Sequence, residues 1–138
     1  MTEIRFVAEP DDAIYDLQNE IFEDYAQKHG ITVGYEPFGF YACENGRIIG
    51  AITGNSYYRE VHISELTVDE DFRGQDIGTE LINAVEEHFK GKGIENINLS
   101  TYAFQAPEFY KKCGYEIEFI RKNAAEPKLD KYYMVKHI

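Results

Sequence analysis

One segment, residues 66–82, constrains the fold of this chain more than any other. A short β-type run ends at Val68, and Arg73, Gly74 and Gly78 lead from it into an amphipathic helical pattern. The first turn of a helix carries backbone N–H groups without an intrahelical partner and a partial positive charge. Glycine lets a ligand approach the backbone, and arginine adds a fixed positive charge. The segment therefore predicts a turn that binds a phosphate or pyrophosphate between a strand and a helix.

Two common phosphate loops do not match this segment. A Walker loop ends in Gly-Lys-Ser/Thr, whereas the chain has Ile77-Gly78-Thr79 at that place. A dinucleotide-binding loop needs three glycines after a first strand, whereas this loop has two glycines and lies in the middle of the chain. The segment alone thus predicts that the ligand carries a phosphate group, but it does not identify the rest of the ligand.

Length and composition predict a single domain, 1–138, with one core. The chain is 43% hydrophobic and 14% aromatic, which excludes a disordered protein. No apolar run approaches the ~20 residues that span a bilayer, and residues 1–5 lack the basic-then-apolar order of a signal peptide. We expect a soluble, cytoplasmic protein without a membrane partner.

The charge of the chain bears on its partners. It has 14 basic and 25 acidic residues and a net charge of −11, which disfavours nucleic acid as a partner. A solvated surface accounts for this acidity more simply than an affinity for cationic substrates such as amines. The four histidines are scattered, so no metal site is expected. Cys43 and Cys113 are expected to be reduced and mostly buried.

Hydrophobic periodicity and turn residues predict an α/β layer with a mixed sheet. The expected segments are strand 4–8, a helix from Asp11 or Asp12 to Gly30, strands 38–43, 47–53 and 61–68, a helix after the glycine loop that ends near Gly91 and Gly93, strand 96–101, a helix from Pro107 to Gly114, and strands 115–120 and 131–135. Simple alternation divides strand 61–68 between two faces. One face would carry Val61, Ile63, Glu65 and Thr67, and the other His62, Ser64, Leu66 and Val68.

Two motifs in the right order resemble the GNAT superfamily of acyl-CoA-dependent N-acetyltransferases. The first matches the family's Arg/Gln-x-x-Gly-x-Gly/Ala loop after a Leu-x-Val strand, and is here Arg73-Gly74-Gln75-Asp76-Ile77-Gly78 after Leu66-Thr67-Val68. The second matches the family's Ala-x-x-aromatic/Leu-Tyr-x-x-x-Gly-aromatic helix and turn, and runs from Ala106 to Tyr115. The order of elements matches over nearly the whole chain, although the N-terminal third matches only in pattern.

The resemblance implies a mixed, mostly antiparallel central sheet with helices on both faces. It also implies that the strand ending at Val68 splays from strand 96–101 to admit the thioester of acetyl-CoA, the cosubstrate, with no metal. The pyrophosphate would lie on the loop amides, and the pantetheine chain would pair with the strand. The implied cofactor-binding residues are Leu66, Val68, Arg73, Gly74, Gln75, Asp76, Ile77, Gly78 and Thr79.

The implied reaction is acetyl transfer, by direct attack, to a primary amine of a small molecule or a protein. A protonated amine must first lose a proton. Glu65 matches the position of an acidic residue that some members use for this step, with His62 or a water chain as alternatives. Tyr110 carries the family's acid role toward the leaving thiolate, and the backbone amide of Val68 matches the family's oxyanion donor. A homodimer is a family-level expectation.

Two residues depart from the family pattern. Asp76 stands where the loop has its central glycine, so its carboxylate either points outward and caps the helix or lowers the affinity for the cofactor. Ala103 stands where many relatives have an asparagine that contacts the cofactor. Asp76 keeps open a second class of function, a non-catalytic regulatory domain that binds acyl-CoA.

Overall fold

The computed structural model describes residues 1–138, which form two compact units, Met1–Val33 and Gly34–Ile138. The first unit contains helix α1 (Asp12–Lys28). The side chain of Asp11 accepts a hydrogen bond from the N–H of Ile14, which makes Asp11 the N-cap. Residues 4–8 join no sheet, so the strand predicted there is wrong. Their alternation is too weak to specify a strand. The expectation of a single domain stays a prediction.

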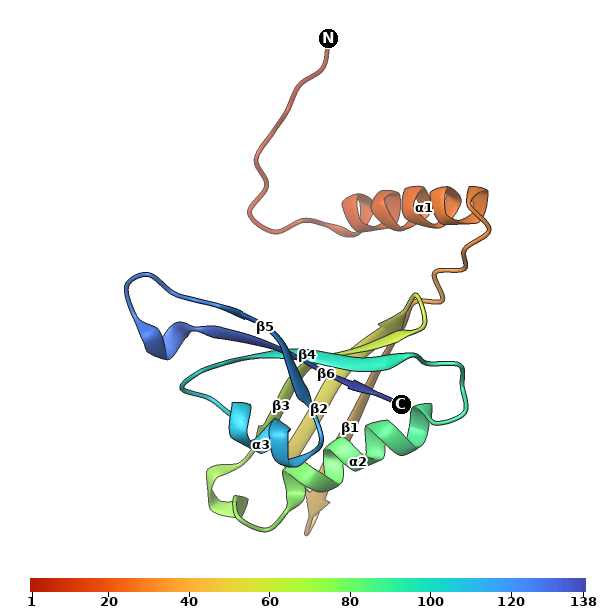
Figure 1. Ribbon diagram of the computed structural model, residues 1–138. Coiled ribbons are helices and arrows are strands. Elements are labelled where there is room, and N and C mark those ends of the chain that lie inside the picture. Colours follow the sequence, from red (N-terminus) through yellow and green to blue (C-terminus); the bar gives the residue numbers. More distant parts are fainter. The chain divides into compact units, whose positions relative to one another are not determined.

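The second unit is built on one six-stranded sheet with the order β1-β2-β3-β4-β6-β5 (Figure 1). All neighbouring strands are antiparallel except β3 and β4, which are parallel. This arrangement confirms the mixed, mostly antiparallel sheet. The strands are β1 (Glu36–Glu44), β2 (Arg47–Tyr57), β3 (Glu60–Val68), β4 (Asn96–Tyr102), β5 (Glu116–Arg121) and β6 (Lys131–His137).

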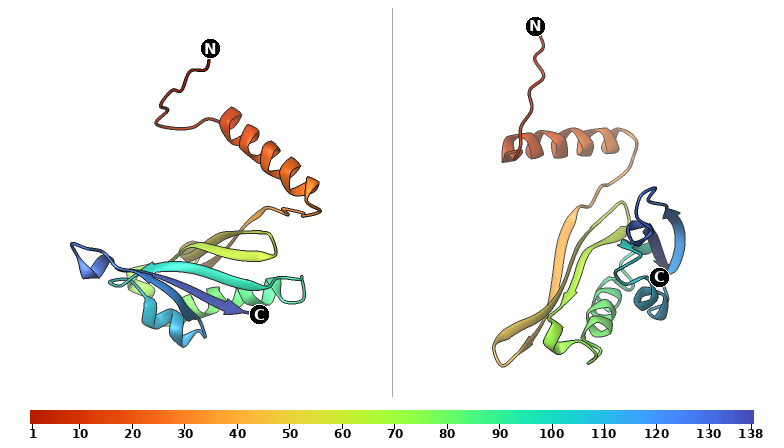
Figure 2. Two further views of the ribbon diagram at one scale, coloured as in Figure 1. Left: turned by 45° about the horizontal axis from the view of Figure 1, so that its top comes forward. Right: turned by 90° about the vertical axis from the view of Figure 1, so that its left-hand side faces the viewer.

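Helices α2 (Ile77–Phe89) and α3 (Pro107–Lys112) lie on the same side of this sheet (Figure 2). Two single 3-10 turns, η1 (Glu70–Phe72) and η2 (Pro127–Leu129), lie in the connections. The apolar stripe of α2 packs on the sheet and forms the core together with strand residues and Tyr110 of α3. Core residues from these elements include Ile52, Val61, Ile82, Val85, Ile97 and Met134. The expectation that helices cover both faces of the sheet stays a prediction.

A β-bulge in β3 changes which side chains face α2. Ile63 lies opposite Gly54 of β2, but Glu65 lies opposite Thr53, so Ser64 is an extra residue. An extra residue reverses the alternation, because successive side chains point to opposite faces. The assignment of faces by simple alternation is therefore wrong. Val61, Ile63, Leu66 and Val68 all belong to the core or pack against it, and Glu65 lies on the other face.

The parallel pair β3–β4 is hydrogen-bonded over a short stretch only. Its register pairs are Glu60–Asn96, Val61–Ile97 and His62–Asn98. Beyond His62 the two strands separate, which confirms the predicted splay. The Asp69 N–H donates to the Ile49 carbonyl (2.7 Å), so the hydrogen-bonded pairs of the antiparallel β2–β3 ladder are Asp69–Ile49 and every second pair from there. In this pattern the N–H and C=O groups of Leu66 and Val68 point away from β2, into the opening.

Two further features bear on the sequence analysis. No helix of the structure is long and apolar enough to cross a membrane. Both cysteines are free, as expected, but Cys43 is exposed and Cys113 is half-buried. Cys43 lies at a register shift near the end of β1, the outer strand of the sheet, which explains why it is not buried.

Candidate functional site

A cavity of about 810 Å³ lies where the end of β3, the start of α2 and helix α3 meet. It is lined by most of the residues that the sequence motifs indicate. These are Leu66, Val68, Arg73, Gly74, Asp76, Ile77, Gly78, Thr79 and Tyr110. Gln75 and Glu65 do not line it. The two motifs, which are separate in the sequence, therefore form one site.

The start of α2 presents free backbone N–H groups to this cavity. The first hydrogen bond of the helix runs from the Glu80 N–H to the Asp76 carbonyl (2.9 Å). The preceding amides of Ile77, Gly78 and Thr79 thus have no intrahelical acceptor, and all three residues line the cavity. We call these three N–H groups the amide cradle. They carry the positive end of the helix dipole and suit an anionic ligand.

Asp76 stands at the N-cap position of α2 without capping it. Its side chain makes no capping hydrogen bond, and its backbone is left-handed, with φ 63°. The interpretation of Asp76 as an outward-pointing cap is therefore wrong. The left-handed conformation explains why glycine suits this position. Asp76 lines the cavity next to the amide cradle.

Gly78 allows α2 and α3 to approach each other. A Cβ atom on Gly78 would lie 3.1 Å from Cζ of Phe109, closer than ordinary van der Waals contact. Phe109 in turn packs against the core and lines the cavity. The second glycine of the loop therefore serves packing as well as access to the backbone.

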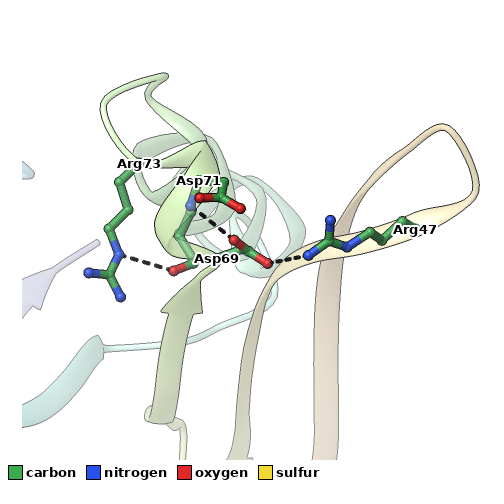
Figure 3. Close-up of polar contacts among 5 residues, drawn as sticks. Arg47, Asp69, Asp71 and Arg73 are labelled. Atoms are coloured by element: carbon green, nitrogen blue, oxygen red, sulfur yellow. Dashed lines mark hydrogen bonds and ion pairs between the residues drawn. The ribbon is translucent and has the colours of Figure 1, made fainter.

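Arg73 lines the cavity and is held there by a backbone contact. Its Nε donates to the Val68 carbonyl (3.2 Å), as Figure 3 shows. The terminal nitrogens of the guanidinium group have no protein partner, so they are available to an anion. The loop itself is fixed by Asp69, whose carboxylate accepts from the Asp71 N–H (2.9 Å) and from Arg47 (2.6 Å).

Tyr110 is a buried tyrosine in the wall of the cavity. Burial, and to a lesser extent the neighbouring Cys113 thiol, raise the pKa of Tyr110 to about 12. The phenol therefore keeps its proton at neutral pH and can act as a proton donor. Burial also raises the pKa of Cys113, and the Glu86 carboxylate adds to that effect.

Glu65 and His62, the two candidate bases, share the sheet face opposite α2. Glu65 is exposed and makes no side-chain hydrogen bond or ion pair. The His62 side chain is half-buried, and its Nδ1 bonds to Oδ1 of Asn98 (2.8 Å). The two residues therefore differ in how firmly the structure holds them.

The sequence reasoning missed several residues of the cavity. They are Thr67, Phe72, Phe104, Gln105, Ala106, Phe109, Lys112 and Cys113. Lys112 matters most, because it supplies a second cation at a site predicted to hold phosphates. Its place two residues after Tyr110, inside the second motif, was the signal that could have indicated it.

A mixed sheet with a splayed strand pair thus meets an amide cradle and a buried tyrosine at one cavity. The chain belongs to the acetyltransferase (GNAT) family, whose model matches residues 6–115.

Individual acetyltransferases are also similar to this chain, in sequence or in fold. Over 84 residues the chain is 33% identical to a blasticidin-S acetyltransferase of Streptomyces morookaense, a match that covers 59% of this chain and 62% of that protein. The chain thus spans less than two thirds of that relative. A crystal structure of an acetyltransferase from Bacillus cereus matches with a TM-score of 0.79 and 25% identity, over 97% of this chain and 98% of that one. An aminoglycoside 6'-N-acetyltransferase complexed with coenzyme A shares the fold, with a TM-score of 0.65 and 22% identity over 74% and 73% of the two chains.

Proposed function

We propose that this protein transfers an acetyl group from acetyl-CoA to a primary amine of a small molecule or a protein. One observation carries the proposal. The amide cradle and the backbone N–H groups of Leu66 and Val68, which have no partner strand, open into one cavity that Tyr110 also lines. That combination offers a place for a pyrophosphate, for an extended amide-containing chain and for a leaving group that needs a proton. The relative that acts on blasticidin S and the neighbour that holds coenzyme A support it.

The chain's own groups fit acetyl-CoA in three places. The amide cradle, Arg73 and Lys112 would hold its phosphates. The outward N–H and C=O groups of Leu66 would pair with the amides of the pantetheine arm, as an added strand would. The Val68 carbonyl already accepts from Arg73, which leaves the Val68 N–H free for the thioester oxygen.

The thioester supplies an activated acetyl group, and three residues act on the reaction. The Val68 N–H stabilises the negative charge that develops on the carbonyl oxygen. The Tyr110 hydroxyl, kept protonated by burial, donates a proton to the departing sulfur. A base on the other face of the sheet, Glu65 or His62, removes the proton that makes the acceptor an ammonium ion. Gln75 does not line the cavity, so no contact between Gln75 and the cofactor is proposed.

A cytoplasmic location and a homodimer remain predictions. The acceptor is defined here only as a primary amine. The acidic surface suits a cationic one, because opposite charges increase the encounter rate.

The function is tested with the parent chain and the Tyr110→Phe variant. We expect both to bind acetyl-CoA with equal affinity in calorimetric titrations. We also expect the parent to release free thiol with amines from a panel of antibiotics, polyamines and N-terminal peptides. The Tyr110→Phe variant should lose about 10²-fold or more in kcat, because only proton donation to sulfur is removed. Equal turnover by both proteins would refute the role of Tyr110.

The competing function is a regulatory domain that binds acyl-CoA without turnover. The carboxylate of Asp76 beside the amide cradle favours it, because a cradle that binds weakly suits a sensor of ligand concentration. Binding of acetyl-CoA with no thiol release on any amine of the panel would support this reading over acetyl transfer.

A further inference from the structure

A row of polar side chains crosses the sheet face opposite α2. It consists of Asn55 of β2, His62 of β3 and Asn98 of β4. Asn55 lies directly opposite His62 in the β2–β3 register, and His62 lies beside Asn98 in the β3–β4 register. Register partners point to the same face, so the three side chains lie side by side. We call them the polar row.

A chain of hydrogen bonds runs from His62 to a carboxylate. The His62 Nδ1 bonds to Asn98 Oδ1 (2.8 Å), Asn98 Nδ2 donates to Asn96 Oδ1 (2.9 Å), and Asn96 Nδ2 donates to Glu60 Oε1 (3.0 Å). All four side chains are supplied by the only paired stretch of the parallel strands. They link β3 and β4 just before the two strands separate.

The carboxylate of Glu60 determines which group donates in each of these hydrogen bonds. An ionised carboxylate accepts hydrogen bonds and cannot donate them, so Glu60 must receive the NH₂ of Asn96. The amide oxygen of Asn96 then faces Asn98 and receives its NH₂. The amide oxygen of Asn98 is left to face His62, whose Nδ1 must therefore carry a proton. In the neutral imidazole the proton-accepting lone pair is thus on Nε2.

Asn55 is the member of the polar row that belongs to β2. Its Oδ1 is buried and has no hydrogen-bond partner. A buried acceptor without a donor is costly, and native structures leave few of them. This oxygen is covered by protein atoms, so Asn55 lies beside His62 as a neutral neighbour and not as a ligand contact.

The position of the polar row suits the chemistry. His62–Asn98 is the last register pair before the opening between β3 and β4. The Leu66 and Val68 backbone groups that would hold the acyl donor line that same opening. Charged groups on this face near His62 are Glu60, Glu65 and His137 of β6, which lies opposite Asn96. β2 contributes only the neutral Asn55 and Tyr57 to this part of the face.

We propose that Glu60, Asn96 and Asn98 hold His62 with its proton on Nδ1, so that His62 Nε2 removes a proton from the acceptor ammonium group. Asn98, Asn96 and Glu60 are positioning residues. This inference rests on the proposed acetyl transfer and assigns its base, for which Glu65 is the competing residue.

The step is a balanced proton transfer. One N–H bond of the ammonium group breaks, and an Nε2–H bond of His62 forms. The electron pair of that N–H bond stays on the nitrogen as the lone pair that attacks the thioester carbon. The imidazolium ion then returns its proton to solvent before the next turnover.

The first test is independent of turnover. Nitrogen-15 NMR of the imidazole ring distinguishes the two neutral tautomers. We expect His62 of the parent chain to be protonated on Nδ1, and expect the Asn98→Leu variant to lose this preference. Protonation of the parent on Nε2 would overturn the inference and leave acetyl transfer untouched.

The second test is the pH profile of kcat/KM, because histidine changes charge between pH 5 and 8. His62→Gln should lower kcat/KM about 10²-fold and abolish the fall in rate toward low pH. Asn98→Leu should lower it about tenfold and shift that fall. Acetyl-CoA affinity should stay at the parental value in both, which excludes misfolding. His137→Gln, the same substitution on the same face, is the matched control and should keep the parental profile.

Two outcomes would count against His62. A His62→Gln variant that keeps the parental pH profile would overturn the inference. So would loss of the low-pH fall in Glu65→Gln but not in His62→Gln, since that result would assign the base to Glu65. A parent chain with the expected tautomer but no turnover on any amine would instead refute the proposed function, and the base role with it.

Discussion

Asp76 carries two costs in the loop before α2. A non-glycine residue in the left-handed region is strained, although aspartate tolerates it better than most. Asp76 also lines the cavity that holds the amide cradle, so its negative charge is close to the place where an anionic ligand is expected. The two costs have different origins, one in the backbone and one in charge, so they can be separated by substitution.

We predict that Asp76→Gly and Asp76→Asn both tighten the binding of coenzyme A by about tenfold, because both remove the negative charge. Only Asp76→Gly should also raise the free energy of unfolding, by roughly 1 kcal/mol, because it relieves the backbone as well. Calorimetric titration and urea denaturation measure the two effects. An unchanged affinity in Asp76→Asn would show that the carboxylate does not act on the ligand.

At the scale of the element, the bulge in β3 depends on Gly54 in the neighbouring strand. A Cβ atom there would lie 2.2 Å from the His62 carbonyl and 2.9 Å from Cζ of Phe38. The bulge brings the β3 backbone close to β2. At this point the core-facing positions of β3 change from odd-numbered to even-numbered residues. Gly54 is therefore needed for close approach rather than for a turn.

We predict that Gly54→Ala lowers the free energy of unfolding by about 3 kcal/mol or more, because the backbone must move to admit the methyl group. Gly39→Ala is the matched control. Its Cβ would meet ordinary contacts of 3.5 Å and 3.6 Å in the adjoining strand pair, so it should cost less than about 1 kcal/mol. Urea denaturation of both variants compares them. Equal losses would mean that the bulge tolerates a side chain at Gly54.

The splay of β3 and β4 gives a prediction for single amides. In the free protein the Leu66 and Val68 N–H groups have no partner strand, so they should exchange rapidly with deuterium. The Thr67 N–H points toward β2 and should be protected, which makes it an internal reference. Acetyl-CoA should slow exchange at Leu66 and Val68 and leave Thr67 unchanged. Protection of Val68 in the free protein would contradict the open strand edge.

The sequence predicted those parts of the molecule whose signals are local. The β run, arginine and glycines before α2, and the proline and tyrosine of α3, lie within short windows with a fixed spacing. The bulge was missed because it depends on Gly54, which is ten residues from Ser64 and gives no sign of its contacts. The polar row was missed for the same reason, since 36 residues separate His62 from Asn98.

At the scale of the whole molecule, two tyrosines make stability depend on alkaline pH. Burial raises the pKa of Tyr110 to about 12, and burial together with Glu86 raises that of Tyr115 further. In the unfolded chain tyrosine titrates near pH 10. Above that value the folded protein holds protons that the unfolded chain has released. The tyrosines' contribution to stability is therefore complete below about pH 10 and is lost as pH rises.

We predict that the free energy of unfolding falls between about pH 10 and pH 12, by up to ~1.4 kcal/mol per pH unit for each retained proton. Tyr115→Phe should make this fall shallower. It should also not destabilise the protein at pH 7, because the buried Tyr115 hydroxyl has no partner. Tyr35→Phe, at an exposed tyrosine, is the control and should keep the parental slope. Urea denaturation of the parent and both variants at several pH values measures these slopes. Identical slopes in the parent and in Tyr115→Phe would refute the prediction.

The splayed strands also affect how this protein meets copies of itself. Unpaired strand edges recruit strands from other molecules and so promote aggregation. Here the unpaired stretches of β3 and β4 lie inside the sheet, with β2 on one side and β6 on the other (Figure 1). A strand of a second molecule cannot reach them from either outer edge of the sheet. The protein thus keeps a hydrogen-bonding edge open for a thin, chain-like ligand without offering it as a template for intermolecular β-pairing.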